Sequence, residues 1–112
     1  MALQEYELNN KALIAAGTPV RKKVTIAAGN DLVAGTIVGR ITASRKFKRS
    51  LIGDADDGSR TAVAVLLEDA AAASADVEAV IGLGGGAYAK DNMTGLTEAA
   101  EDALEARGIY FL

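Results

Sequence analysis

The sequence predicts a mainly β fold with one short C-terminal helix, and three observations support this prediction. Short runs rich in Val, Ile and Thr recur along the chain and are bounded by Gly, Asn, Asp or Ser, which is typical of strands joined by turns. Only one segment, late in the chain, has both a helix-start and a helix-stop signal. The 112 residues amount to one small domain with a modest core.

Residues 1–20 are predicted to form a flexible N-terminal arm that precedes a β-rich domain over residues 21–112. The segment is too short to be a stable isolated helix in water. The segment as a whole is more apolar than a solvated tail needs to be. This favours an extended segment that becomes ordered when it binds a partner. A frayed terminus or an N-terminal edge strand is the alternative. The candidate partner-binding residues of the arm are Tyr6, Leu8, Leu13 and Ile14.

The body is expected to contain several short strands separated by turns. Gly39 lies inside one of them, which indicates a bulge or a close approach of another backbone segment. Residues 61–67 are continuously apolar, as in a strand buried on both faces. The expected strands are residues 22–26, 36–42, 61–67 and 76–81, with pairing resumed at 87–90, and the expected turns are residues 27–31, 53–59 and 82–86.

The helix is expected to begin after Thr97, a good N-cap residue, with Glu98 in the first turn, where the helix dipole favours an acid. Leu104 is the expected core anchor of this helix, and Gly108 stands at the C′ position, where a left-handed residue is favoured. Residues 109–112 form the most hydrophobic tetrapeptide and are predicted to be an edge strand.

The composition excludes several kinds of chemistry. The chain contains 23 Ala and 12 Gly but no His, Cys or Trp. It therefore has no Ser-His-Asp or Cys-His catalytic group, no thiolate- or imidazole-bound metal and no disulfide. We assign no catalytic residue, metal ligand or cofactor and expect a protein that is not an enzyme. Because Tyr6, Tyr110 and Phe111 lie outside the central body, an interior of Val, Ile, Leu and Ala is expected, and such small cores often depend on oligomerisation.

Three motifs resemble chemical sites but are better explained as turns. Residues 82–87 fit GxGxxA, yet no helix follows to bind a pyrophosphate, and the acid at a suitable distance, Asp102, lies on the predicted helix. Residues 54–58 resemble a calcium loop, but Gly58 is fifth instead of sixth and the twelfth residue is Val65. Four further carboxylates are interpreted as turn or interface residues: Glu68, Asp69, Asp76 and Glu78.

Charge is divided unevenly along the chain. Residues 1–50 contain nine basic and three acidic residues, whereas residues 51–112 contain three basic and twelve acidic residues. A basic face that meets an acidic face of a neighbouring subunit explains this division, and the candidate docking residues are Arg45, Lys46, Lys48 and Arg49. The alternative is a small nucleic-acid-binding or assembly module that uses residues 45–49, although stacking aromatics are scarce. The sequence has no signal-peptide pattern and no apolar run of membrane-spanning length, so a soluble protein made in a cytoplasm is expected.

The order of segments resembles the bacteriophage head decoration proteins, the lambda-type capsid-stabilising family. Two stretches carry most of the resemblance, Gly35-Thr36-x-x-Gly39-x-Ile41-Thr42 and Asp57-Gly58-Ser59-x-x-Ala62-Val63-Ala64-x-Leu66-x-Glu68-Asp69. Supporting positions are Val24, Ile26, Gly29, Leu32, Asp76, Ala79, Val80 and Leu104-x-Ala106-Arg107-Gly108-Ile109. The chain departs from the family pattern at residues 44–47, where a Gly-basic-aromatic turn is expected, and it lacks the late Trp of some members.

The resemblance implies a β-tulip fold, a small barrel or sandwich with an extended N-terminal arm. It implies a homotrimer that binds the major capsid protein on the outside of the phage head. The sites are three-fold and quasi-three-fold positions, where the trimers stabilise the shell against DNA pressure. The arm, residues 1–20, is then expected to add to the capsid lattice by strand pairing. The expected location is the virion, after synthesis in the host bacterial cytoplasm, with no membrane partner and no direct nucleic-acid contact.

Overall fold

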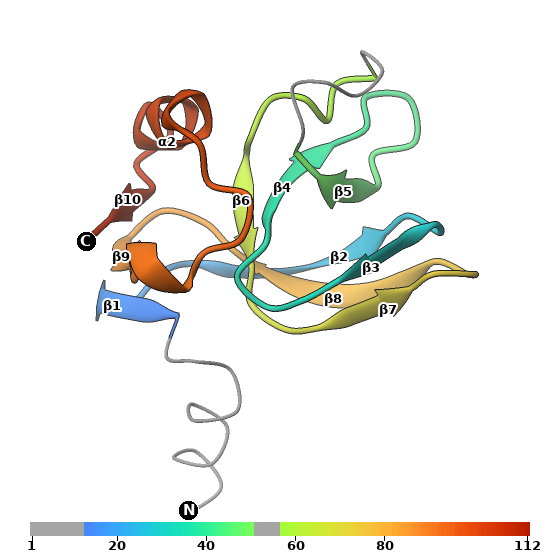
Figure 1. Cartoon of the computed structure of the whole chain (residues 1–112), viewed down its shortest axis with the longest axis horizontal. Coiled ribbons are helices and arrows are strands. Elements are labelled where there is room, and N and C mark those ends of the chain that lie inside the picture. Colours follow the sequence, from blue (N-terminus) through green and yellow to red (C-terminus); the bar gives the residue numbers. More distant parts are fainter. Residues whose placement is uncertain (1–12, 51–56) are drawn as a thin grey trace, which may run out of the picture.

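A closed barrel of five short strands forms the centre of the protein (Figure 1). The computed structural model describes residues 13–50 and 57–112. Around the barrel the strand order is β2-β5-β4-β6-β8, and every pairing is antiparallel except that of β2 with β5. The barrel strands are β2 (Arg21–Ile26), β4 (Ile37–Arg40), β5 (Phe47–Arg49), β6 (Ala64–Leu66) and β8 (Val77–Gly82).

A three-stranded sheet and a helix pack beside the barrel. In this sheet β9 (Gly86–Tyr88) pairs antiparallel with β1 (Ile14–Gly17) and parallel with β10 (Tyr110–Phe111). A 3₁₀-helix at Lys90–Asn92 follows β9, and helix α2 (Glu98–Glu105) packs against β10. The mainly β fold with a small barrel and one late helix is therefore confirmed.

A two-stranded ribbon extends from the barrel on the side away from α2. It consists of β3 (Asn30–Leu32) and β7 (Ala70–Ala72), which pair antiparallel. Figure 1 shows the ribbon alongside β2 and β8, at the opposite end of the protein from β1, β9 and β10. The sequence did not predict these two strands, because three successive alanines show neither alternation nor the β-branched side chains that are typical of strands.

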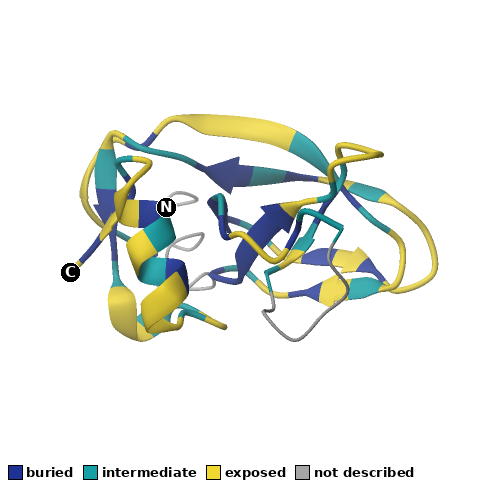
Figure 2. Ribbon diagram, turned by 90° about the horizontal axis from the view of Figure 1, so that it is seen from above, coloured by how far each residue is buried: buried dark blue, intermediate teal, exposed yellow. Residues whose placement is uncertain are grey.

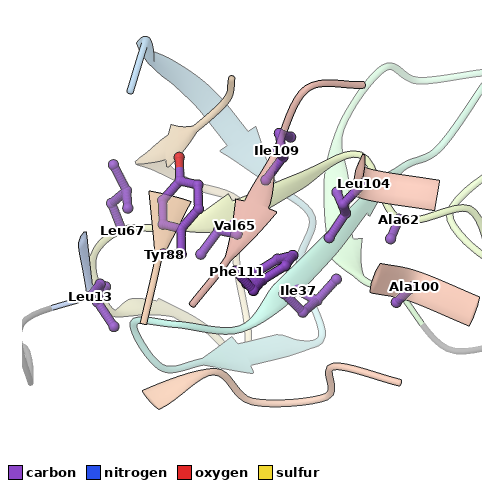
Figure 3. Packing of buried hydrophobic residues seen from close by; sticks show 10 residues of the cluster. All are labelled: Leu13, Ile37, Ala62, Val65, Leu67, Tyr88, Ala100, Leu104, Ile109 and Phe111. Atoms are coloured by element: carbon purple, nitrogen blue, oxygen red, sulfur yellow. The ribbon is translucent and has the colours of Figure 1, made fainter. Parts of the chain in front are cut away.

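The buried hydrophobic residues form two clusters. We call the first the barrel cluster, and its members are Ile26, Leu32, Val38, Phe47, Ala64, Leu66, Ala70, Ala72, Ala79 and Ile81. We call the second the sheet–helix cluster, and its members are Leu13, Ile37, Ala62, Val65, Leu67, Tyr88, Ala100, Leu104, Ile109 and Phe111 (Figure 3).

Strand β6 contributes to both clusters. Ala64 and Leu66 belong to the barrel cluster, whereas Val65 between them belongs to the sheet–helix cluster. Because successive side chains of a strand point to opposite faces, β6 is covered on both sides, and all three residues are buried. The prediction of a strand with two buried faces is confirmed.

The expectation that Phe111 lies outside the core is wrong. In β10, Phe111 pairs with Tyr88 of β9, and the two ring centroids are 6.1 Å apart. Tyr110, one residue earlier, is 52% exposed because alternate residues of β10 face opposite ways. Phe47 is also buried, so the interior contains aromatic residues as well as the expected aliphatic ones.

Helix α2 is capped at both ends as the sequence predicts. The Thr97 hydroxyl accepts a hydrogen bond from the backbone N–H of Ala100 (3.1 Å). At the other end Gly108 has φ 81°, and the N–H of Ile109 donates to the carbonyl of Leu104 (3.0 Å), as in a Schellman motif. The helix buries Ala100 and Leu104 and exposes its other side to solvent (Figure 2). Leu104 is therefore the core anchor of α2, as predicted.

At Gly39 a second backbone segment lies close to β4. A Cβ atom at this position would overlap the backbone carbonyl oxygens of Ser59 and Thr61. The interpretation of Gly39 as a site of close backbone approach is confirmed. The loop that contains Ser59 therefore lies directly against β4.

Candidate functional site

The N-terminal segment that was expected to bind a partner is partly built into the body. Leu13 is 6% exposed and lies in the sheet–helix cluster, and Ile14 is half-buried and pairs with Tyr88. Residues Ile14–Gly17 thus form an edge strand of the sheet, the alternative that the sequence left open. Tyr6 and Leu8 lie outside the described residues.

The basic segment of residues 45–49 forms the turn before β5 and β5 itself. Phe47 anchors it in the barrel cluster, and Arg45 occupies the turn with φ 63°. Lys46 Nζ lies 2.6 Å from Asp76 Oδ2, and Lys48 Nζ lies 2.9 Å from Asp57 Oδ2. Two of the four predicted docking residues therefore pair with acids of their own chain, whereas the side chains of Arg45 and Arg49 are exposed.

Asp57 connects the loop before β6 to the barrel. Its Oδ1 accepts hydrogen bonds from the Ser59 hydroxyl (2.5 Å) and the Ser59 backbone N–H (2.9 Å). These hydrogen bonds, together with the Lys48 ammonium, hold the pKa of Asp57 well below its usual range. The backbone N–H of Thr42 also donates to the Asp57 carbonyl (2.8 Å). Residues 54–58 resemble a calcium loop in sequence, and the structure describes residues 57 and 58 of this segment. Within it, Asp57 has a structural role.

Three of the four remaining candidate carboxylates accept hydrogen bonds from backbone amides. Asp76 Oδ1 accepts from Ala28 N–H (2.8 Å), and its pKa is lowered by Lys46 and by this hydrogen bond. Asp69 Oδ1 accepts from the N–H of residue 34 (2.8 Å), and Glu68 Oε1 accepts from the N–H of residue 80 (3.2 Å). These contacts support the interpretation of the three residues as turn carboxylates. Glu78 of β8 pairs with Thr25 of β2, and its side chain is exposed.

The glycine-rich segment is a loop between two strands, as predicted. It joins β8 to β9, and the next α-helix in the described residues begins only at Glu98, so no α-helix starts directly after the glycines. Asp102 lies on that helix. Val20 and this loop are joined by the hydrogen bond from Val20 N–H to the Gly84 carbonyl (2.9 Å).

Tyr88 is a structural residue that the sequence analysis did not single out. It is fully buried, and its hydroxyl donates to the Leu83 carbonyl (2.8 Å), so that it holds the glycine-rich loop against the core. Burial raises the pKa of Tyr88 to about 12. In the sequence, the only local indication that Tyr88 belongs to the folded body was the strand pairing expected to resume at residues 87–90.

The described residues contain neither a candidate metal-binding cluster nor a candidate membrane-spanning helix. No group of three or more His, Cys, Asp or Glu side chains in residues 13–50 and 57–112 is placed to hold a metal ion. No helix in the same residues has the length and apolar character needed to cross a membrane.

The described residues thus form a small β-barrel protein in which several carboxylates accept hydrogen bonds from backbone amides. A profile of the family described as bacteriophage lambda head decoration protein D matches residues 3–109. Because the match covers nearly the whole chain, the protein belongs to the bacteriophage lambda head decoration protein D family. It is thus a viral structural protein that decorates the capsid of a phage head. No curated protein matches the chain.

Proposed function

We propose that this protein assembles as a homotrimer and reinforces the outer surface of a phage head. The trimers occupy three-fold and quasi-three-fold positions, bind the major capsid protein and stabilise the shell against the pressure of packaged DNA. The observation that carries this proposal is the family match over residues 3–109. The protein has no catalytic role in this account and no membrane or nucleic-acid partner, and it is made in the host bacterial cytoplasm before it joins the virion.

The distribution of exposed charge supports a closed ring of identical subunits. Arg21, Lys22 and Lys23 of β2 are all exposed. Helix α2 exposes an acidic row at i, i+4 and i+7 formed by Glu98, Asp102 and Glu105. A cyclic trimer is built from head-to-tail contacts between two different surfaces of the chain. Opposite charges on those two surfaces favour the correct register between neighbours.

The arm, residues 1–20, is proposed to supply the main contact with the shell. Strand addition suits such a segment because main-chain hydrogen bonds repeat along it and alternate side chains fill pockets. Tyr6 and Leu8 precede β1 in the sequence and would fill such pockets. Leu13 and Ile14, which pack with the sheet, would then anchor the arm to the body. Weak contacts of this kind become strong when three arms act together.

The test is co-sedimentation with expanded empty shells of the phage that encodes the protein. A deletion of residues 1–20 would also remove Leu13 and β1, so the informative deletion covers residues 2–12. We expect this variant to remain a trimer, with three times the mass of its own shortened chain, and to lose shell binding. Sedimentation of the variant at wild-type occupancy would overturn the arm proposal.

A point-substitution pair makes the same test without shortening the chain. Tyr6→Ser with Leu8→Ser removes the apolar side chains of the arm, and we expect shell occupancy to fall strongly. Asn9→Ser with Asn10→Ser is the matched control and is expected to bind as wild type. A strict monomer for the wild-type protein at high concentration would contradict the trimer.

The alternative, nucleic-acid binding through Arg45–Arg49, is less well supported, because Lys46 and Lys48 pair with Asp76 and Asp57. Phosphate contacts would give a DNA affinity that falls steeply with salt. Absence of DNA binding at low salt would eliminate this alternative.

A further inference from the structure

The ribbon of β3 and β7 is fastened at its outer end by one carboxylate. Asp76 lies in the turn between β7 and β8, and its Oδ1 accepts a hydrogen bond from the N–H of Ala28, in the turn between β2 and β3 (2.8 Å). Figure 1 shows both turns at the end of the ribbon farthest from β1. Asp76 Oδ2 lies 2.6 Å from Lys46 Nζ, in the turn before β5. Asp76 thus joins three turns, and we call its contacts with Ala28 and Lys46 the Asp76 clasp.

The ribbon is a weak element by itself. Each of its strands has three residues, and those of β7 are all alanine. Alanine has a low strand propensity and little apolar surface to bury, and a two-stranded pairing alone is at best marginally stable in water. At the outer end the Gly29 N–H donates to the Ala72 carbonyl (2.7 Å). Because this pairing is so short, the Asp76 clasp is expected to contribute much of the stability of the outer end.

The inner face of the ribbon covers part of the barrel cluster. Leu32, Ala70 and Ala72 are buried members of that cluster, whereas Asp31 and Ala71 between them are exposed. Strand β3 packs against β5, and β7 packs against β8. The buried members of the sheet–helix cluster come from outside the ribbon. Opening of the ribbon would therefore expose apolar surface of the barrel while the sheet–helix cluster stays in place.

The inner end of the ribbon is fastened separately. Asp69, which directly precedes β7, accepts a hydrogen bond on Oδ1 from the Ala34 N–H (2.8 Å). The next amide along the chain, that of Gly35, donates to the Leu66 carbonyl (2.7 Å). Leu66 belongs to β6, so this end is tied to the centre of the barrel. The outer end is thus expected to open first, with the inner end as its hinge.

The charges around Asp76 determine how the clasp responds to pH. Lys46 supplies the positive charge of the ion pair. The charged neighbours along the adjoining segments are Arg45 and Glu78, both exposed, and residues 27–29 carry no charge. The contact with Lys46 and the backbone hydrogen bond lower the pKa of Asp76. The clasp therefore stabilises the closed ribbon fully above pH 3.8, the ordinary aspartate value, and loses this effect as the pH falls below it.

We propose that acid releases the Asp76 clasp, and that the outer end of the ribbon then opens while the rest of the protein stays folded. Proteins open locally at a smaller free-energy cost than they unfold globally, and short elements with little buried apolar surface open first. The segments that open are residues 27–32 and 70–76. The β1-β9-β10 sheet, which lies at the opposite end of the protein, stays closed (Figure 1).

The test is hydrogen exchange of backbone amides in the full chain, followed by NMR from about pH 6 to about pH 3. The reporters are the amides of Ala28 and Gly29 at the outer end. The references are the amides of Leu66 and Ala89, which donate to backbone carbonyls in the barrel and beside β9. After correction for the pH dependence of the exchange chemistry, protection of the reporters should fall roughly 3- to 10-fold more than that of the references.

Two substitutions assign the effect to the carboxylate. Asp76→Asn mimics the uncharged acid, because the amide keeps an oxygen acceptor and loses the charge. In this variant the reporter amides should show, near pH 6, the low protection that the wild type reaches near pH 3. Glu78→Gln is the matched control, since it makes the same kind of change two residues away on an exposed side chain. This control should follow the wild-type profile.

Two results would overturn the proposal. If the reporters of the wild type lose no more protection in acid than the references do, the ribbon does not open on its own. If the reporters of Asp76→Asn still lose protection in acid as the wild type does, a group other than Asp76 controls the ribbon. Should Asp76→Asn fail to fold, the wild-type profile alone decides. The free chain is used throughout, so the outcome does not depend on shell binding.

Discussion

The barrel cluster and the sheet–helix cluster meet at β6 but are built from different parts of the chain. The barrel cluster draws its members from residues 26–81 and includes four alanines. The sheet–helix cluster draws its members from residues 13–111 and includes Tyr88 and Phe111. The first cluster therefore depends on close approach of small side chains, and the second on large side chains from both ends of the chain.

This difference bears on function because the arm that is proposed to contact the shell joins the protein on the sheet–helix side. Leu13, which lies immediately before β1, belongs to this cluster. The sheet–helix cluster thus fixes the point from which the proposed arm begins. The barrel provides the scaffold against which that cluster packs, through Ile37 and Val65.

The largest expected effect comes from truncating one leucine in each cluster. Leu104 and Leu66 are both 0% exposed. Leu104→Ala and Leu66→Ala should each lower the free energy of unfolding by about 2–5 kcal/mol through lost burial and a cavity. Chemical denaturation measures both, and Leu112→Ala is the exposed control, expected within about 0.5 kcal/mol of wild type. A cost below that level for either buried leucine would show that its cluster is not a packed core.

A smaller effect is expected from enlarging an alanine of the barrel cluster. Ala79 is fully buried, so Ala79→Leu should overpack the barrel and destabilise the protein by about 1–3 kcal/mol. Ala71→Leu on β7 is the matched control, because Ala71 is exposed. Equal stability of the two variants would mean that the barrel has room for larger side chains and that the contrast between the clusters is wrong.

Removing the cap of α2 should have a smaller effect still. Thr97→Ala deletes the hydroxyl that accepts from Ala100 N–H and should cost about 1 kcal/mol in thermal or chemical unfolding. Thr97→Ser keeps the hydroxyl and should restore most of the loss. If the serine variant is as unstable as the alanine variant, the hydrogen bond is not the stabilising contact.

The pH dependence of stability tests the ion pairs on the barrel side. The pKa of Asp57 is lower in the folded protein than the ordinary value of 3.8, chiefly because Ser59 donates to its carboxylate. Its contribution is therefore fully present above pH 3.8 and is lost as the pH falls below that value. Asp57→Asn should be less stable than wild type near neutrality and should lose less stability on acidification.

Asp91→Asn, an exposed carboxylate replaced by the same amide, is the control for acid unfolding. Wild-type protein and the Asp91 variant should have the same acid limb in a plot of unfolding free energy against pH. An acid limb unchanged in Asp57→Asn as well would show that the loop anchored by Asp57 does not contribute to acid sensitivity.

Local sequence was sufficient where alternation, caps and glycines determine the structure. It predicted β2, β4, β6 and β8, the caps of α2 and the close approach at Gly39. It did not predict β3 and β7, because the alanines at 70–72 become a strand only through pairing with residues 30–32. Nor did it place Phe111 in the core, since that depends on the register of β10 with β9.

The candidate site was predicted less completely for the same reason. The partners of Lys46 and Lys48 lie far along the chain, at Asp76 and Asp57, and only the folded barrel brings them together. The sheet that places Tyr88 and Phe111 in the core and Tyr110 at the surface requires three strands from residues 14–17, 86–88 and 110–111. A pattern in any one of these segments does not indicate the surface that they form.

The central claim is that this chain decorates a phage head as trimers placed on the outside of the shell. A cryo-electron microscopy map of expanded shells saturated with the protein tests this directly. The account predicts added outer density of three copies at every three-fold and quasi-three-fold position. Shells without added outer density, or with single copies at other positions, would contradict it.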